Sequence, residues 1–239
     1  MPLDHDTPDR EDDPASHDRH AVAPGSTEAD ATAVCAALQA YRAPDGPLLD
    51  LGCGTGRHLR ALAGRGHRLV GLDHDPRMLA AARVAGVPDG CRLTEADAAA
   101  FTCPERFAAA ILLNRSLTCF HSHRLATGLF ACVAAHLRPG GLFLIDNCCT
   151  ALWREVAAGN YGDGLSADGN EQMFFLPGEN RFVYRRGPAV DADSWTPKAE
   201  DRIFRLWSLG EVALAAAGAG LALCRLASDS ALIVIRRQE

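Results

Sequence analysis

The run LLDLGCGTGRHLRAL at residues 48–62 limits the possible folds more than any other part of the chain. An apolar segment of strand length contains Asp50, three glycines follow at alternate positions, and leucines with helical spacing continue from Arg57. Glycine adopts left-handed backbone conformations without steric cost, so such a turn lets the backbone approach a ligand at the carboxyl end of a sheet. The run therefore predicts a strand, a ligand-binding turn and a helix.

The chain repeats this alternation of strand and helix as far as residue 150. Such an order implies a doubly wound α/β fold, in which helices cover both faces of a mostly parallel sheet. The expected strands are 47–52, 68–73, 91–97, 107–114 and 141–148, and the expected helices between them are 57–66, 76–86 and 122–137.

Two parts of the chain depart from this order. Residues 1–28 are acidic and almost free of large apolar side chains, which predicts a disordered leader before a domain at 29–239. Within 150–205, three segments alternate like antiparallel strands, and we expect an insertion that acts as a substrate-binding lid. A helix at 208–220 and a hairpin around Asp229 close the chain.

Composition excludes several classes of protein. The formal net charge is −6 and no Lys/Arg block occurs, which argues against nucleic-acid binding. The apolar stretches are shorter than the roughly 20 residues that span a bilayer, and the acidic N-terminus is unlike a signal peptide. The 9 cysteines contain no CxxC pair, so we expect free thiols in a reducing cytoplasm and no metal site. A homodimer is left open.

The glycine spacing favours a cationic ligand over a phosphate. Gly52, Gly54 and Gly56 give G-x-G-x-G, and Arg57 stands where a dinucleotide-binding turn has its third glycine. No G-K-[ST] follows, as a P-loop would require. The carboxylate of Asp50 would repel a pyrophosphate but suits a cationic ligand.

Polar side chains also end the next three strands. Asp73 lies about 20 residues beyond the glycines, where a carboxylate accepts hydrogen bonds from ribose hydroxyls. Asp97 could accept from an adenine amino group, and Asn114 ends the fourth strand. One such residue is an ordinary strand cap, but a series at successive strand ends indicates a nucleoside site.

These stretches together resemble the class I S-adenosylmethionine-dependent methyltransferases over about residues 46–150. The resemblance is carried by LLDLGCGTGRHLRAL, VGLDHDPRMLAAAR, EADAAAF, FAAAILLNRSLTCF and LRPGGLFLIDN, in the family's order. It implies a Rossmann-like sheet of seven strands, S-adenosyl-L-methionine as cofactor, and methyl transfer to an O or N atom. The glycine segment and the late insertion are similar to enzymes that act on small molecules in natural-product biosynthesis.

The resemblance also assigns roles to individual positions. The first turn would hold the methionine part, the second strand the ribose, the third the adenine edge, and the fourth the region of the sulfonium. The implied cofactor-binding residues are Asp50, Gly52, Cys53, Gly54, Asp73, His74, Met78, Asp97, Ala98 and Asn114.

The methyl acceptor is harder to assign. Arg115-Ser116-Leu117 follows Asn114 instead of the P-P-Y of enzymes that methylate bases or amides, which argues against those substrates. His121 and His123 are candidate general bases, although positioning and desolvation alone can support this reaction. Candidate substrate contacts are Tyr41, Arg115, Ser116, Asn147, Trp153 and Tyr161, and three arginines at 181, 185 and 186 could receive an anionic acceptor.

Three alternatives stay open. A protein of this fold could use the same cofactor for an intramolecular cyclisation that releases methylthioadenosine. A catalytically silent cofactor-binding subunit is the second alternative. An NAD-dependent oxidoreductase is the third, and Arg57 in the glycine motif disfavours it.

Overall fold

The computed structural model describes residues 26–224 and 230–238. The first described helix, α2 (Ser26–Ala40), includes the last three residues of the expected leader, so residues 26–28 are helical. Residues 1–25 of the predicted leader and the predicted turn at Asp229 lie outside the described residues.

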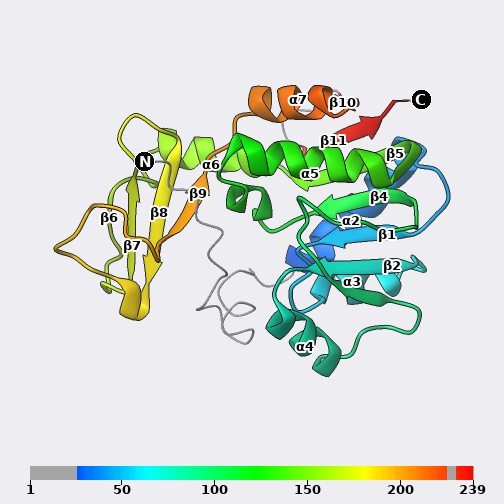
Figure 1. The fold of residues 1–239 in the computed structure, drawn as a ribbon, viewed down its shortest axis with the longest axis horizontal. Helices are drawn as coiled ribbons and strands as arrows, with labels where there is room; N and C mark the ends of the chain where they lie inside the picture. The colour runs from blue at the N-terminus through cyan, green and yellow to red at the C-terminus, as the bar shows by residue number, and fades with distance from the viewer. Residues whose placement is uncertain (1–25, 225–229, 239) are drawn as a thin grey trace.

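The main sheet has seven strands in the order β10-β11-β5-β4-β1-β2-β3 (Figure 1). Neighbouring strands from β5 to β3 pair in parallel, whereas β11 runs antiparallel to both β5 and β10. This confirms the predicted doubly wound, mostly parallel sheet with a reversed hairpin at its edge. The strands are β1 (Leu48–Leu51), β2 (Leu69–Asp73), β3 (Arg92–Glu95), β4 (Phe107–Leu112), β5 (Leu137–Asp146), β10 (Leu221–Leu223) and β11 (Leu232–Arg237).

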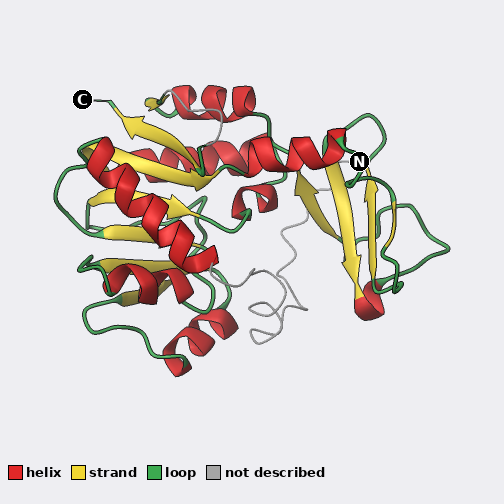
Figure 2. Cartoon of the chain, turned by 180° about the vertical axis from the view of Figure 1, so that it is seen from behind, coloured by secondary structure: helices red, strands yellow, loops and turns green. Residues whose placement is uncertain are grey.

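Successive residues of a strand point to opposite faces of the sheet. Both faces of this sheet carry apolar side chains, and helices cover both of them. On β1, Leu49 and Leu51 join the core under α5, α6 and α7, whereas Leu48 joins the core under α2, α3 and α4. Figure 2 shows α2 crossing the second of these faces. The covering helices are α3 (Arg57–Ala63), α4 (Pro76–Val84), α5 (His123–His136), α6 (Cys148–Ala157) and α7 (Leu209–Gly218).

A second sheet lies beyond the carboxyl ends of the parallel strands (Figure 1). Its four strands are antiparallel and adjacent in sequence, in the order β6-β7-β8-β9. They fall within the expected insertion, and the three longer ones match the three predicted segments. They are β6 (Gly164–Leu165), β7 (Glu171–Phe175), β8 (Arg181–Arg186) and β9 (Arg202–Arg205).

The two faces of the second sheet differ in character. One face presents Phe182, Tyr184 and Phe204 toward the core of the main domain. The other face buries Arg185, whose guanidinium donates to both oxygens of Asp201 at 2.7 Å. The same group also donates to the Gln172 side chain and to the carbonyls of residues 194 and 196. Arg185 therefore fastens the loop after β8 to the sheet and is unavailable to an anionic substrate.

No helix among the described residues is both long enough and apolar enough to cross a membrane. All nine cysteines are free thiols.

Candidate cofactor and acceptor site

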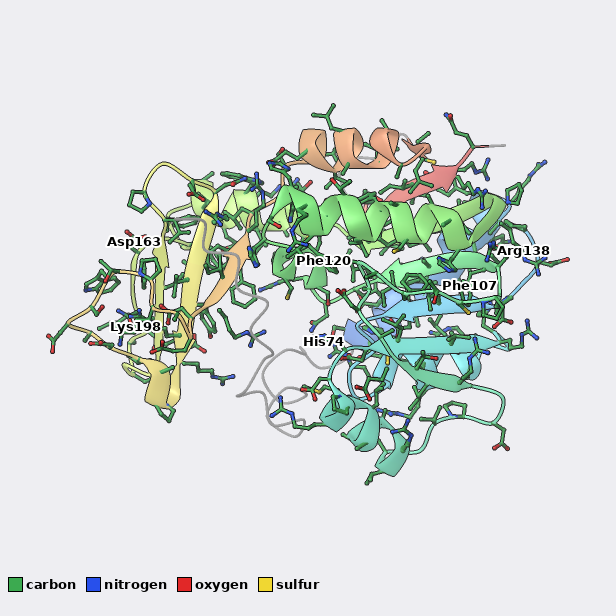
Figure 3. All side chains as sticks on the ribbon, viewed as in Figure 1. His74, Phe107, Phe120, Arg138, Asp163 and Lys198 are labelled. Carbon is green, nitrogen blue, oxygen red and sulfur yellow. The ribbon has the colours of Figure 1, made fainter. Side chains whose placement is uncertain are left out.

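The carboxyl ends of the parallel strands meet at the edge of the main sheet that faces the second sheet. Figure 3 shows His74, which follows β2, and Phe120, which follows the turn after β4, at this edge. Phe107 and Arg138, near the starts of β4 and β5, lie at the opposite end (Figure 3). Parallel sheets bind ligands at the carboxyl edge, so the predicted cofactor residues were sought there.

The glycine turn has the backbone conformation that its sequence predicts. Gly52, Gly54 and Gly56 have φ angles of 64°, 53° and 76°, which disfavour any residue with a Cβ. A Cβ on Gly52 would have no neighbour nearer than the Ser116 hydroxyl, at 4.0 Å. The backbone at Gly52 therefore borders open space, as a close approach to a ligand requires. The neighbouring Cys53 is buried in the core, where its backbone N–H donates to the carbonyl of Leu72.

Asp73 connects this turn to the end of β2. Its Oδ2 accepts from the Gly54 N–H at 2.7 Å, and its Oδ1 accepts from the Asp75 N–H at 2.9 Å. Each carboxylate oxygen has a second acceptor site, which leaves the residue able to take two ribose hydroxyls. The backbone bonds hold the carboxylate in a fixed orientation beside the glycines.

Asp50 is a buried carboxylate with unused hydrogen-bonding capacity. The residue is 2% exposed, and its Oδ2 has no hydrogen-bond partner among the described residues. Burial raises the pKa of Asp50 to about 6, Asp73 adds to the rise, and His58 and Arg57 oppose it. An unpaired buried carboxylate is costly, and a cationic group of a ligand would satisfy it.

The N-terminal helix α2 also contributes to this region. Asp30 of α2 contacts the buried His58 of α3 through an Oδ2–Nε2 distance of 3.0 Å. His58 is one of the groups that lower the pKa of Asp50. Sequence reasoning missed this pair because the two residues are distant in the chain, and the motif that contains His58 does not show which helix packs against it.

The adenine-side residues lie after β2 and β3. His74 is exposed, with its Nδ1 3.8 Å from Asp73 Oδ1, whereas Met78 is buried in α4. Asp97 is exposed, and its Oδ1 accepts from the Ala99 N–H at 2.8 Å. Ala98 packs against the core. Asp97 thus has a fixed side chain with a second oxygen exposed.

The turn after β4 is strained at two consecutive positions. Asn114 and Arg115 both have φ near 60°, in the left-handed region that residues with a Cβ rarely adopt. The Arg115 N–H donates to Asp146 Oδ2 at 3.0 Å, and the Ser116 hydroxyl donates to the carbonyl of Leu113. Sequence reasoning passed over Asp146, although it ends β5 in the same way that Asp73 ends β2.

The two candidate bases flank the start of α5. His121 follows the short 3-10 helix η1 (Ser116–Cys119), and Ser122 caps α5 by accepting from the Leu125 N–H. The Nε2 of His123 lies 3.1 Å from Arg205 Nη2, and its ring packs edge-on against Trp207. Arginine can only donate here, so that nitrogen of His123 acts as an acceptor.

The predicted substrate contacts do not form one cluster. Tyr41 lines a hollow of about 440 Å³ with Pro139, Gly140 and Arg236, at the amino edge of the parallel strands. Tyr41 lies in the segment that leads into the start of β1, and the parallel strands start at the amino edge of the sheet. Tyr41 is therefore at the opposite end of the sheet from the site at the carboxyl edge. The prediction for this residue was wrong.

Two other predicted contacts have structural roles at the junction of the domains. Asn147 caps α6 through a bond from the Thr150 N–H, and its amide donates to the carbonyl of Ser230. The Trp153 indole N–H donates to the carbonyl of Trp207 at 3.2 Å. This bond joins the segment that enters the insertion to the segment that leaves it.

Tyr161 lies on the aromatic face of the second sheet, edge-on to Phe182. Burial raises the pKa of its hydroxyl, and the nearby charge of Arg115 acts in the opposite direction. Burial likewise raises the pKa of Tyr184, assisted by a hydrogen bond with Glu171. The strained turn after β4 therefore lies near a face with two tyrosines and a carboxylate. Tyr184 is among the aromatic residues that the sequence offered for the acceptor pocket, but its pairing with Glu171 was missed because strand register, not sequence spacing, brings the two together.

The described residues contain no group of three or more His, Cys, Asp or Glu side chains that could hold a metal ion. The arrangement instead combines fixed carboxylates, an open glycine turn and an aromatic face. These are the features that the sequence predicted for a nucleoside with a cationic group.

Comparison with known proteins identifies the domain. Residues 48–141 match the family model described as a methyltransferase domain. The match covers the glycine turn and the ends of β1 to β4. The family predicted from the sequence motifs is therefore confirmed over these residues.

Solved structures agree in fold across most of the chain. A S-adenosylmethionine-dependent methyltransferase from Clostridium acetobutylicum has 16% identity and a TM-score of 0.69, with 93% of this chain and 96% of that chain covered. CalS10, an amino pentose methyltransferase from Micromonospora echinaspora, has 23% identity, a TM-score of 0.64, and 89% and 92% coverage. The sugar N-methyltransferase KedS8 from Streptoalloteichus has 22% identity, a TM-score of 0.65, and 89% and 88% coverage. No curated protein sequence matches the chain.

Proposed function

We propose that the protein binds S-adenosyl-L-methionine and transfers its methyl group to an O or N atom of a small molecule. The observation that carries this proposal is the unpartnered, buried Oδ2 of Asp50 beneath a glycine turn in a methyltransferase domain. An anionic ligand would be repelled by this carboxylate, whereas the cofactor has an ammonium and a sulfonium.

The residues at the carboxyl edge fit this cofactor. Gly52 and Gly54 would admit the methionine part, Asp50 would balance its positive charge, and Asp73 would accept from the ribose hydroxyls. His74 and Met78 would border the adenine, Asp97 and Ala98 would contact its edge, and Asn114 would lie toward the sulfonium. When bound, the cofactor supplies an electrophilic methyl group, which the acceptor takes up as S-adenosylhomocysteine is released.

The insertion at 150–205 is the proposed acceptor-binding lid of a domain that spans 29–239. Tyr161 on its aromatic face and Arg115 in the β4 turn are close enough to interact electrostatically, so an acceptor between them would adjoin the methionine side of the cofactor. Ser116 borders the same space, because its hydroxyl is the nearest neighbour that a Cβ on Gly52 would meet. Two structural relatives act on sugars, which supports a sugar-like natural product as the acceptor.

Proton removal from the acceptor is assigned in this proposal to His121 or His123, which lie on either side of Ser122 at the start of α5. The Nε2 of His123 accepts from Arg205. The chain's own contribution to rate would come chiefly from positioning the acceptor and excluding water around it. The net charge and the free cysteines support a cytoplasmic enzyme with small-molecule rather than nucleic-acid substrates. A homodimer stays a prediction.

Isothermal calorimetry with S-adenosylmethionine tests the proposal directly. The parent protein is expected to bind, and Asp73→Ala is expected to bind far more weakly. Absence of binding by the parent protein would overturn the proposal. Mass spectrometry of the spent cofactor then separates the chemistries, because methyl transfer yields S-adenosylhomocysteine and cyclisation yields methylthioadenosine.

A further inference from the structure

The carboxylate of Asp146 has two oxygens in different situations. Oδ2 accepts from the backbone N–H of Arg115 at 3.0 Å, across the ends of β5 and β4. Oδ1 is buried and has no hydrogen-bond partner among the described residues. Burial raises the pKa of Asp146 to about 6, and the bond from Arg115 opposes that rise. A carboxylate kept in such surroundings costs stability, so packing alone does not account for it.

The group that Asp146 holds is the strained turn itself. Arg115 and Asn114 are two consecutive left-handed residues with side chains, an arrangement that persists only when neighbouring groups enforce it. The Thr118 hydroxyl donates to the carbonyl of Arg115, so both backbone polar groups of this residue are fixed. Of these two bonds, only the one to Asp146 ties the turn to another strand of the sheet.

This turn is also one wall of the candidate cofactor site. Ser116 is the nearest neighbour that a Cβ on Gly52 would meet, and Asn114 is the polar residue that ends the fourth strand. A change in the backbone at Arg115 would therefore move Ser116, which borders the glycine turn, together with Asn114 on the other side of it. Asp146 is placed to control that geometry from the neighbouring strand.

We propose that Asp146 is a positioning residue, which holds the Asn114–Arg115 turn in its left-handed conformation and thereby shapes the methionine side of the cofactor site. The inference rests on the proposed function. It assigns to Asp146 no direct contact with the reacting atoms.

A double-mutant cycle tests this role, with S-adenosylhomocysteine as the calorimetric probe. Asp146→Ala removes the acceptor for the Arg115 N–H and is expected to weaken binding about 10-fold or more, the loss typical of one charge-assisted hydrogen bond. Asp146→Asn keeps a carbonyl oxygen for the same N–H and should lose less than about 3-fold. In an Arg115→Gly background, the left-handed conformation is no longer strained, so Asp146→Ala should have an effect below about 3-fold.

Asp163→Ala is the matched control. Asp163 also accepts a backbone N–H, from Phe175 at 2.7 Å, but it lies at the second sheet (Figure 3). Its removal should leave the affinity for S-adenosylhomocysteine within about 2-fold of the parent, because it is no part of the turn.

Hydrogen exchange of the peptide that covers Arg115 gives a readout independent of the cofactor. Asp146→Ala should accelerate exchange at this amide, whereas Asp146→Asn should not. Equal affinity of the parent and Asp146→Ala, whatever the exchange result, would overturn the positioning role. Failure of the parent to bind S-adenosylhomocysteine would overturn the proposed function and this role with it, and the exchange data would then show only whether Asp146 braces the turn.

Discussion

Two buried charges, Asp50 in the main sheet and Arg185 in the second sheet, are treated in opposite ways by the fold. The guanidinium of Arg185 makes five hydrogen bonds, two of them to the carboxylate of Asp201. Asp50 keeps one carboxylate oxygen without a partner among the described residues. A fully satisfied buried charge holds structure together, whereas the unsatisfied oxygen of Asp50, beside an open glycine turn, is available to a cationic ligand.

Substitution of Arg185 should have the largest effect on stability. Arg185→Ala leaves the buried carboxylate of Asp201 without its partner, which typically costs about 3–5 kcal/mol. The free energy of unfolding in urea should fall by that amount. The control is Arg186→Ala, at a partly exposed guanidinium on the other face, which should cost less than about 1 kcal/mol. A similar small loss for both variants would contradict the structural role of Arg185.

Asp50→Asn should stabilise the cofactor-free protein while it weakens cofactor binding. Burial raises the pKa of Asp50 from its ordinary value of 3.8 to about 6 in the folded protein, so its contribution to stability is fully present below 3.8 and is lost as the pH rises through 6. Asparagine does not ionise, so the variant avoids this loss of stability. At a pH about 1.5 units above the pKa of Asp50, its free energy of unfolding should exceed the parent's by up to about 3 kcal/mol.

Two measurements check this prediction for Asp50. Thermal unfolding should show the advantage of Asp50→Asn shrinking to nothing as the pH falls toward 4, roughly the ordinary pKa of an aspartate. Calorimetry at neutral pH should show cofactor affinity reduced about 10-fold or more. A variant that is less stable than the parent at neutral pH would show that Asp50 serves the fold instead.

Asp73→Asn should weaken cofactor binding, and the size of the loss tests whether Asp73 binds the ligand. An amide has one oxygen, so it cannot accept from both Gly54 and Asp75, and it presents a donor where the ribose needs an acceptor. Affinity for S-adenosylmethionine should fall about 10–100-fold, or about 1.4–2.7 kcal/mol. Calorimetry checks the value. The control is Asp89→Asn, the same substitution at an exposed aspartate.

The smallest effect is expected at His123. Because its Nε2 accepts from Arg205, we predict that His123→Ala changes kcat less than about 3-fold and keeps the shape of the pH–rate profile. His121→Ala should remove the acidic limb of that profile. If only His123→Ala lost the acidic limb of the pH–rate profile, His123 and not His121 would be the general base.

The sequence was sufficient for features set by local spacing. Leu48, Asp50 and the three glycines follow one another within a single strand and turn, so their arrangement could be predicted from backbone chemistry. Asp73 could be found in the same way. Tyr41 was assigned to the wrong edge, because the composition of a segment does not show at which end of a sheet it lies. The contacts of Asp30 with His58 and of Glu171 with Tyr184 depend on packing and register, which no short motif encodes.

The hydrogen bond between Trp153 and the carbonyl of Trp207 has a consequence for the evolution of such enzymes. It places the entry and the exit of the second sheet side by side, beside the face on which Phe182, Tyr184 and Phe204 pack against the main core. A segment whose two ends lie together can be lengthened or shortened without displacing a strand of the main sheet. Under the proposed lid role of this segment, acceptor choice can diverge between lineages while the ends of β1 to β4 stay as they are.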